Sequence, residues 1–285
     1  MASHKEIKER ITSVNNTLKI TSAMRMISSV KLHRSQLAAA GIGPYQRALK
    51  EIFIETAAGQ TEGSSVYMEN RKIKKVAIVA LSSNSSLCGA FNSNIEKTVK
   101  NVIEEYKSLG KENIMLFPVG KKISKALIHL KYPVESINSG IADKPTYALC
   151  SELASNLMSL FRDKNVDRIE LIYNHFKTTN NQVVTREVFL PLDSLHEERG
   201  NPSDYIFEPD REKIINELID KVLTFKIFAI IRDSNAAEHA ARTVAMQIAS
   251  DNATKLIQEL TVQYNKSRQQ AITNELLDIM GGIAR

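Results

Sequence analysis

The stretch that decides the fold runs from Asp210 to Met280 and reads DREKIINELIDKVLTFKIFAIIRDSNAAEHAARTVAMQIASDNATKLIQELTVQYNKSRQQAITNELLDIM. It contains neither glycine, which costs about 1 kcal/mol inside a helix, nor proline, which costs about 3 kcal/mol. Pro209 precedes it and Gly281 follows it, so both ends of a helix are marked. One uninterrupted helix of this length would measure about 105 Å, which is too long to be buried in the core of its own chain.

The composition is that of a soluble globular chain. Of the 285 residues, 43% are hydrophobic and 25% are charged. No apolar run approaches the roughly 20 residues needed to cross a bilayer. The two cysteines, Cys88 and Cys150, lie far apart and form no CxxC motif. We therefore expect a reduced cytosolic protein that is neither secreted nor membrane-spanning.

The positive charge is concentrated near the amino terminus. Between Glu9 and Glu51 there is no acidic side chain, whereas lysine and arginine recur throughout. Such a segment favours an acidic partner surface, which could be a nucleic acid, an acidic protein collar or an anionic membrane.

Residues 3–40 also have a helical pattern. Ser3 and Glu6 have the spacing of a capping box, and the first glycine or proline is Gly41. After the break at Gly41–Pro44, helix can resume from Tyr45 to Ala58. If the break is only a kink, this helix would reach about 80 Å.

Both helical stretches carry narrow stripes with a period near 3.5 residues, which is typical of a two-helix coiled coil. The alternative is that each helix is one face of a globular bundle, but the stripes are thin and the polar circumference is wide. Because the second helix is longer, we expect its end to project unpaired for about 25 Å. The expected seam is Ile7, Ile11, Val14, Leu18, Ile20, Met24 (or Ala23) and Ile27 in the first helix, and Ala237, Ala241, Val244, Ile248, Ala253, Ile257, Leu260, Tyr264, Ser267 and Ala271 in the second.

Between the helices, strand and helix patterns alternate. The run from Val76 to Leu81 is apolar throughout, as in a buried parallel strand. The predicted fold class is α/β: a long antiparallel coiled coil of the N- and C-terminal helices with an inserted doubly wound, Rossmann-like domain. The further expected strands are Asn113–Val119, Val134–Ile137, Arg168–Asn174 and Val183–Leu190, and the expected helices are Asn94–Leu109, Lys121–Leu130 and Tyr147–Arg162. The expected domains are residues 1–58, 72–192 and 210–285.

No catalytic, cofactor or metal site is predicted. The turn Ser82–Asn92 stands where α/β folds bind phosphate, yet it matches neither GxGxxG nor GxxxxGK[ST] and contains only Gly89. The six histidines are scattered, without metal-ligand spacing. Three classes stay open at this point: a mechanical protein with a rod inserted in a partner, an α/β enzyme that dimerises through a coiled coil, and a basic coiled-coil protein that binds nucleic acid.

The two ends of the chain resemble the gamma subunit of F-type ATP synthases. The matching segments are Lys5–Met24, Glu238–Ala253 and Leu260–Leu276, and the resemblance extends along the whole chain. One departure lies in the middle: the family's turn usually reads Asp/Asn-Arg-Gly-Leu-Cys-Gly, and here it is Asn84-Ser-Ser-Leu-Cys-Gly89.

The resemblance implies a central-stalk rotor that couples proton-driven rotation of the membrane c-ring to ATP synthesis on the alpha and beta subunits. The shaft would stand in a ring of three alpha and three beta subunits, and the α/β domain would join the epsilon subunit and the c-ring. The chain would regulate ATPase activity and proton flow without being catalytic itself. It would bind no cofactor and no nucleic acid. It would lie on the cytoplasmic face of the bacterial inner (plasma) membrane as a peripheral subunit of a rotary motor.

The same resemblance places partner contacts on both helices. On the first helix they are Met24 and Arg25, and on the second they are Arg242, Arg268, Gln269, Thr273 and Glu275. Arg268 and Gln269 would donate hydrogen bonds to a loop of the beta subunit. For each residue the alternative is packing within the coiled coil or simple solvation.

Overall fold

The structure is a computed structural model that describes residues 4–57, 66–130, 132–135, 139–192, 208 and 211–283. The chain forms two compact units, one made of Met1–Ser29 with Arg242–Arg285 and the other of Val30–Ala241. Helix α1 spans His4–Ala57 and helix α6 spans Arg211–Ile283, so each long helix contributes to both units. The predicted domain division stays a prediction, because these compact units cut across both helices.

Each long helix runs through the point where a break or an end was predicted. Helix α1 continues through Gly41, Gly43 and Pro44. A β-carbon at either glycine would meet no atom within 4 Å, so this turn is not crowded, and the Pro44 nitrogen has no hydrogen to donate to the helix. Helix α6 passes Gly281 and ends at Ile283, a shift within the usual uncertainty of helix ends.

The second unit contains a four-stranded sheet with the order β2-β1-β3-β4. Strand β1 is parallel to β2 and to β3, and β4 is antiparallel to β3. β3 and β4 are consecutive and form a hairpin. The strands are β1 (Val76–Leu81), β2 (Ile114–Val119), β3 (Arg168–Thr178) and β4 (Asn181–Leu190).

The predicted strand Val134–Ile137 is wrong in its described part. Only Val134 pairs, through an isolated parallel bridge to Leu116, while Ile137 lies outside the described residues. The run is short and follows Pro133, which has no N–H to donate to a ladder. Two backbone bonds form here: the Leu116 nitrogen donates to the Pro133 oxygen, and the Glu135 nitrogen donates to the Leu116 oxygen, each at 2.9 Å.

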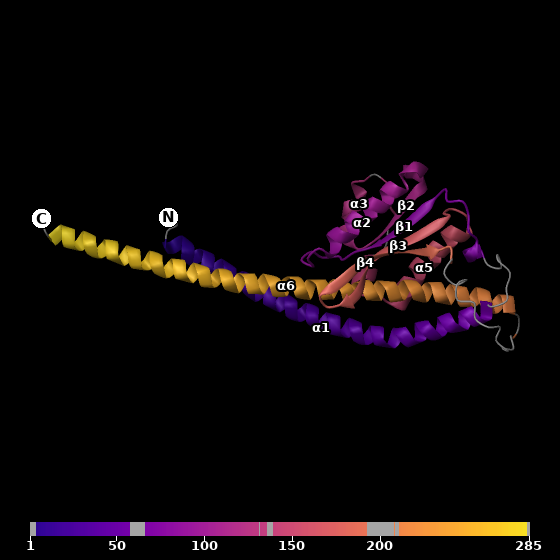
Figure 1. The fold of residues 1–285 in the computed structure, drawn as a ribbon, viewed down its shortest axis with the longest axis horizontal. Coiled ribbons are helices and arrows are strands. Elements are labelled where there is room, and N and C mark those ends of the chain that lie inside the picture. Colours follow the sequence, from indigo (N-terminus) through magenta and orange to yellow (C-terminus); the bar gives the residue numbers. More distant parts are fainter. Residues whose placement is uncertain are drawn as a thin grey trace. The chain divides into compact units, whose positions relative to one another are not determined.

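Helices cover both faces of the sheet, as expected for a doubly wound domain (Figure 1). One apolar cluster joins the sheet to α2 and α3, and the other joins its opposite face to α5 and to the first half of α6. The α6 residues Ile215, Ile219, Leu223 and Ile227 recur every fourth position and face this second cluster. The domain helices are α2 (Phe91–Glu105), α3 (Lys121–Ile128), α4 (Gly140–Asp143) and α5 (Tyr147–Arg162), with short 3₁₀ turns η1 (Val66–Met68), η2 (Lys107–Leu109) and η3 (Lys111–Asn113).

In the first unit, α1 and α6 pair antiparallel. The hydroxyls of Thr21 and Ser250 lie 2.9 Å apart, and the rings of His4 and Tyr264 lie 4.2 Å apart between centroids. Leu260 is buried in the pair. The described part of α6 beyond Tyr264 lies past the residues that α1 offers for pairing, and it is almost entirely exposed.

The predicted seam is wrong at Ile20, Ile27 and Ile248, all of which are exposed. The buried positions of α1 are instead Thr21 and Ser28, which continue the 3-4 spacing from Leu18. The reason is that these small polar residues occupy the interface, where the Thr21 hydroxyl is hydrogen-bonded to Ser250. The seam is therefore partly polar, and the larger apolar side chains lie outside it. The last predicted seam residue, Ala271, is exposed because it lies beyond Tyr264.

In the second unit, two neighbouring alanines of α6 face different partners. Ala236 packs with Leu32 of α1, whereas Ala237 packs with Cys88 and Phe91 in the turn that follows β1. Ala241 lies against this second cluster too, so the prediction that Ala237 and Ala241 form the seam with α1 is wrong. The small side chains let α6 approach both surfaces closely.

Candidate partner interface

All seven predicted contact residues belong to the first unit. Met24 is half-buried on α1. Arg25 donates from Nη1 to the Oε1 of Gln247 on α6, so its guanidinium is engaged within the coiled coil. Arg242 is buried, and its side chain is not left without a partner. These two arginines therefore take part in packing of the unit, and any partner contact they make would add to that role.

The four residues beyond Tyr264 are placed differently. Arg268, Gln269, Thr273 and Glu275 are exposed on α6. The Thr273 hydroxyl donates to the backbone oxygen of Gln269 at 2.9 Å, whereas the side chains of Arg268 and Gln269 form no hydrogen bond or ion pair with the described residues. The arrangement leaves two polar side chains with hydrogen-bonding capacity next to one another on an unpaired helix.

Exposed apolar side chains accompany the polar ones, and two of them, Ile20 and Ile27, were predicted to lie in the seam. In the first unit they include Ile20, Met26 and Ile27 on α1. On the end of α6 they are Ile272, Leu276, Leu277, Ile279 and Met280. A contiguous set of exposed apolar groups on a helix is typical of an interaction surface. In the sequence, these exposed apolar residues can be recognised because they fall outside the 3-4 spacing of the buried seam positions.

The turn that follows β1 contacts the first backbone amide groups of α3, the helix that begins after β2. At the start of α3, the Lys121 nitrogen donates to Asn84 Oδ1 at 2.9 Å, the Lys122 nitrogen to the Ser83 oxygen at 3.2 Å and the Ile123 nitrogen to Ser82 Oγ at 3.0 Å. These are the amide groups that would otherwise bind an anion. The turn after β1 therefore caps α3.

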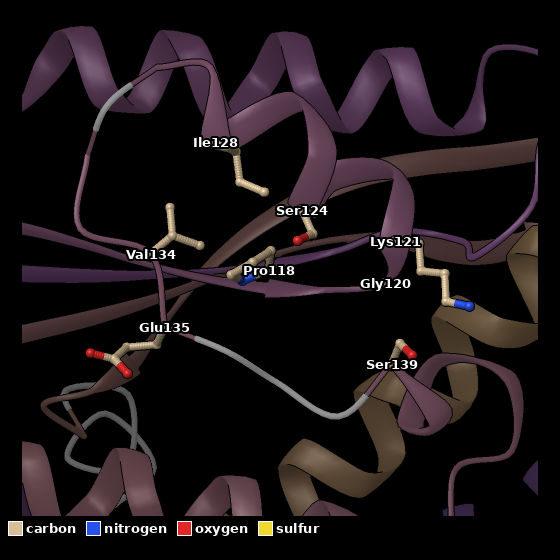
Figure 2. A pocket seen from close by; sticks show the side chains of 8 residues that line it. All are labelled: Pro118, Gly120, Lys121, Ser124, Ile128, Val134, Glu135 and Ser139. Atoms are coloured by element: carbon tan, nitrogen blue, oxygen red, sulfur yellow. The ribbon is translucent and has the colours of Figure 1, made fainter.

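A pocket of about 270 Å³ lies beside this cap, at the carboxyl end of β2 (Figure 2). Its wall combines Pro118, Ile128 and Val134 with the polar residues Ser124 and Ser139. The charged ends of its remaining long side chains, Lys121 and Glu135, point to opposite sides in Figure 2 and do not converge on a common ligand position. Within the described residues, no group of histidine, cysteine and carboxylate side chains could hold a metal ion.

One ion cluster holds β3, β4 and α2 together. Glu170 is fully buried and accepts hydrogen bonds from Arg186 Nε at 2.7 Å, Arg168 Nε at 2.9 Å and the Tyr106 hydroxyl at 2.6 Å. Burial by itself would raise the pKa of Glu170, but the hydrogen bonds from Arg186 and Tyr106 hold this pKa below its usual value. Glu170 is thus an ionised structural carboxylate, and its charge is neutralised by its partners.

Two further groups have shifted pKa values. Burial raises the pKa of the Cys150 thiol to about 12, so this cysteine is not a nucleophile near neutral pH. Burial also raises the pKa of Asp233 on α6, and the neighbouring His175 and the Phe176 N–H partly counteract this increase. His175 Nδ1 lies 2.7 Å from Asp233 Oδ2, so this pair joins the end of β3 to α6.

In the described part of the chain, none of the helices has the length and apolar character that crossing a membrane would require.

The fold defines a class of protein: an α/β domain inserted between two long helices that pair as an antiparallel coiled coil. A family model described as "ATP synthase" matches residues 3–284. The chain belongs to this ATP synthase family. Its curated relatives include the ATP synthase gamma chain of Phocaeicola vulgatus, 51% identical over 286 residues, and that of Bacteroides fragilis (strain ATCC 25285), 53% identical over 287 residues. Each alignment covers 99% of both chains.

Solved structures share the fold at lower sequence identity. A chain in the Euglena gracilis mitochondrial ATP synthase, in rotational state 3, gives a TM-score of 0.66 at 16% identity and covers 99% of this chain and 93% of its own. A chain in the central stalk and c-ring of the Tetrahymena thermophila mitochondrial enzyme gives 0.57 at 23% identity and covers 81% of this chain and 99% of its own.

Proposed function

We propose that this chain is the gamma subunit of a rotary ATP synthase. It would form the central stalk that couples rotation of a membrane c-ring to ATP synthesis on alpha and beta subunits. The single observation that carries the proposal is the antiparallel pair of α1 and α6 continued by an unpaired, exposed end of α6. Paired helices resist bending and twisting better than one helix, and the unpaired end offers side chains to a surrounding partner. Full-length identity of about half to curated gamma chains supports the same role.

In this role the chain transmits force and carries out no bond-making step. At the start of α3 the amide groups are used by the turn after β1, so this helix end does not offer them to a phosphate. Catalysis would take place on the partner subunits, and the chain would influence ATPase activity and proton flow only through coupling. Functionally, residues 1–58 and 210–285 would be the shaft and residues 72–192 the part that joins epsilon and the c-ring. The complex would lie on the cytoplasmic face of a bacterial inner membrane.

The proposed contacts with the beta subunits are those suggested by the resemblance. Arg268 and Gln269 are the first candidates, because both are exposed on the unpaired part of α6 and can donate hydrogen bonds. Thr273 and Glu275 are exposed further along the same helix, and Met24 is half-buried on α1. Arg25 and Arg242 would act chiefly by holding the paired helices in place.

The test is assembly and coupling with the host's own subunits. The chain should copurify with alpha and beta subunits, each in threefold excess, and the reconstituted complex should pump protons when it hydrolyses ATP. A chain that is recovered alone as a homodimer would contradict the proposal.

A variant pair tests the contact site. Arg268→Ala should lower the ATPase activity of the assembled complex about tenfold, since hydrogen bonds to charged groups contribute about 1.5–3 kcal/mol. Lys255→Ala removes a charge from an exposed position in the paired part of α6 and serves as the control, with little expected change. Equal activities of the two variants would count against Arg268 as a contact residue.

A further inference from the structure

One segment of α6, from Ser234 to Ala240, is buried at every position. A surface helix normally exposes at least half of its circumference, so a fully buried segment must be contacted on all sides. All of its contacts described here belong to the second unit. The surrounding elements are α1, α4 and the turn that follows β1.

The apolar contacts of this segment are made by alanine methyl groups. Ala236 and Ala240 pack with Leu32 of α1, and Ala237 packs with Cys88 and Phe91 of the α/β domain. Apolar contacts of this kind bring the helices close together, but they are non-directional. A small rotation of α6 about its axis would preserve much of the buried apolar area. Alanine packing therefore does not by itself fix the rotational setting of the helix.

Asn235 provides directional contacts in the same segment. Its side-chain Nδ2 donates to the backbone oxygen of Ala142 in α4 at 2.9 Å, and its Oδ1 accepts from Ser35 Oγ of α1 at 3.2 Å. The residue is 7% exposed. The carbonyl of Ala142 can only accept, which fixes the orientation of the amide. One side chain of α6 thus links the partner helix and the α/β domain at once.

A second directional contact lies half a turn away. The Asp233 carboxylate accepts from the Phe176 nitrogen at 3.3 Å and lies 2.7 Å from His175 Nδ1. It joins α6 to the end of β3, but it does not reach α1. Of the two residues, Asn235 alone connects all three elements in the described contacts.

We propose that Asn235 is a positioning residue that fixes the rotational register between the α/β domain, α6 and α1. Torque applied to the domain then reaches both helices of the coiled coil without angular slip. A single buried polar residue is known to set register in coiled coils at some cost in stability, and Asn235 extends this role to a third element. The inference rests on the proposed rotor function.

The experiment compares three variants in the assembled, membrane-bound complex. Asn235→Asp keeps the acceptor for Ser35 but loses the donor to Ala142, so it releases the domain and leaves the helix pair joined. Ser35→Ala releases only the helix pair. Ser250→Ala is the matched control. It removes the hydrogen bond to Thr21, which also joins α1 and α6 but lies in the first unit, and this unit contains no part of the α/β domain. ATP-driven proton pumping is measured at matched ATPase rate, and thermal stability of the complex is measured in parallel.

Asn235→Asp should lower pumping per ATP hydrolysed about twofold or more, since losing one net hydrogen bond changes a conformational equilibrium by about two- to tenfold. Ser250→Ala should leave pumping per ATP unchanged even where it lowers the melting temperature. Normal pumping by Asn235→Asp would overturn the proposal, as would an equal loss in the control.

Two precautions keep the outcome decisive. If Asn235→Asp does not assemble, Asn235→Ser is used, whose short hydroxyl cannot span both partners, and normal pumping by this variant overturns the proposal equally. Failure of the parent chain to assemble or pump would refute the rotor function itself and is separate from any effect of the variants.

Discussion

Replacing Glu170 by glutamine should reveal how the ion cluster holds the sheet together. The carboxylate is fully buried and accepts three kinds of donor, from Arg186, Arg168 and Tyr106. Breaking a buried ion pair by removing one partner costs about 3–5 kcal/mol. The side chains of Arg168 and Arg186 are 28% and 32% exposed, so water can reach them after the change. We therefore expect Glu170→Gln to lower the free energy of unfolding by about 3 kcal/mol at neutral pH, the low end of that range.

The same variant should change the pH dependence of stability. The folded-state pKa of Glu170 lies below the ordinary value of 4.5 for a glutamate. An acid whose pKa is lowered on folding stabilises the protein above its unfolded-state pKa, and this contribution is lost as pH falls through the folded-state pKa. The difference between parent and variant should therefore be largest at neutral pH and should shrink at acidic pH, beginning near pH 4.5.

Urea unfolding followed by far-UV circular dichroism measures both effects, and tyrosine fluorescence provides a second signal because the chain has no tryptophan. The control is Glu105→Gln, which removes another carboxylate bound to Arg186, at a side chain that is 56% exposed. It should cost less than about 0.5 kcal/mol. The reasoning would be refuted if Glu170→Gln lowered the free energy of unfolding as little as the control does. It would also be refuted if the stability difference between parent and variant did not shrink at acidic pH.

Three further outcomes are expected. Gly120→Ala should destabilise the α/β domain, because φ at Gly120 is +109° and a β-carbon would lie 2.8 Å from Ser82 Oγ; thermal unfolding checks this, and an unchanged melting temperature would contradict it. Leu260→Ala should destabilise the assembled complex by about 2–3 kcal/mol whereas Ile248→Ala, an exposed residue of the same helix, should not; equal effects would mean that the buried seam has been misplaced. Met24→Lys should weaken coupling in the assembled complex by adding a charge at a half-buried position of α1 that we propose lies near the beta subunits; equal proton pumping at matched ATPase rate in variant and parent would argue against it.

The elements that were predicted well are those in which local preference and tertiary packing agree. The long helix α6 follows from the absence of glycine and proline between Asp210 and Met280. Strand β1 is apolar at every position because both faces of the sheet are covered, and all six residues are buried. Helix α6 and strand β1 can be predicted without knowing which surfaces of the folded chain contact one another.

The errors arise where a residue's partner decides its environment. Ile20 and Ile248 have the right polarity for a seam but are exposed, while Thr21 and Ser250 are buried because each satisfies the other's hydroxyl. Hydrophobic periodicity cannot identify such a pair, since each hydroxyl alone favours an exposed position. Ala237 is ambiguous for a different reason: an alanine fits any close contact, and the α/β domain rather than α1 lies against it.

The proposed contact residues rest on resemblance alone. Arg268 and Gln269 are ordinary exposed side chains on a helix, and nothing in their spacing distinguishes them from solvated positions. The structure adds that Arg25 is engaged with Gln247 inside the pair, a contact between positions far apart in the chain. That pairing requires the antiparallel register, which the periodicity of either helix alone does not determine.

The exposed end of α6 has a consequence for the newly made chain. Leu276, Leu277, Ile279 and Met280 are exposed on α6, and no second helix among the residues that the structure describes covers them. Before assembly, such an exposed apolar surface can bind a second copy of the chain as well as the intended partner. The free subunit should therefore be short-lived or prone to aggregate in the cell, and its yield should depend on how promptly the surrounding subunits are synthesised alongside it.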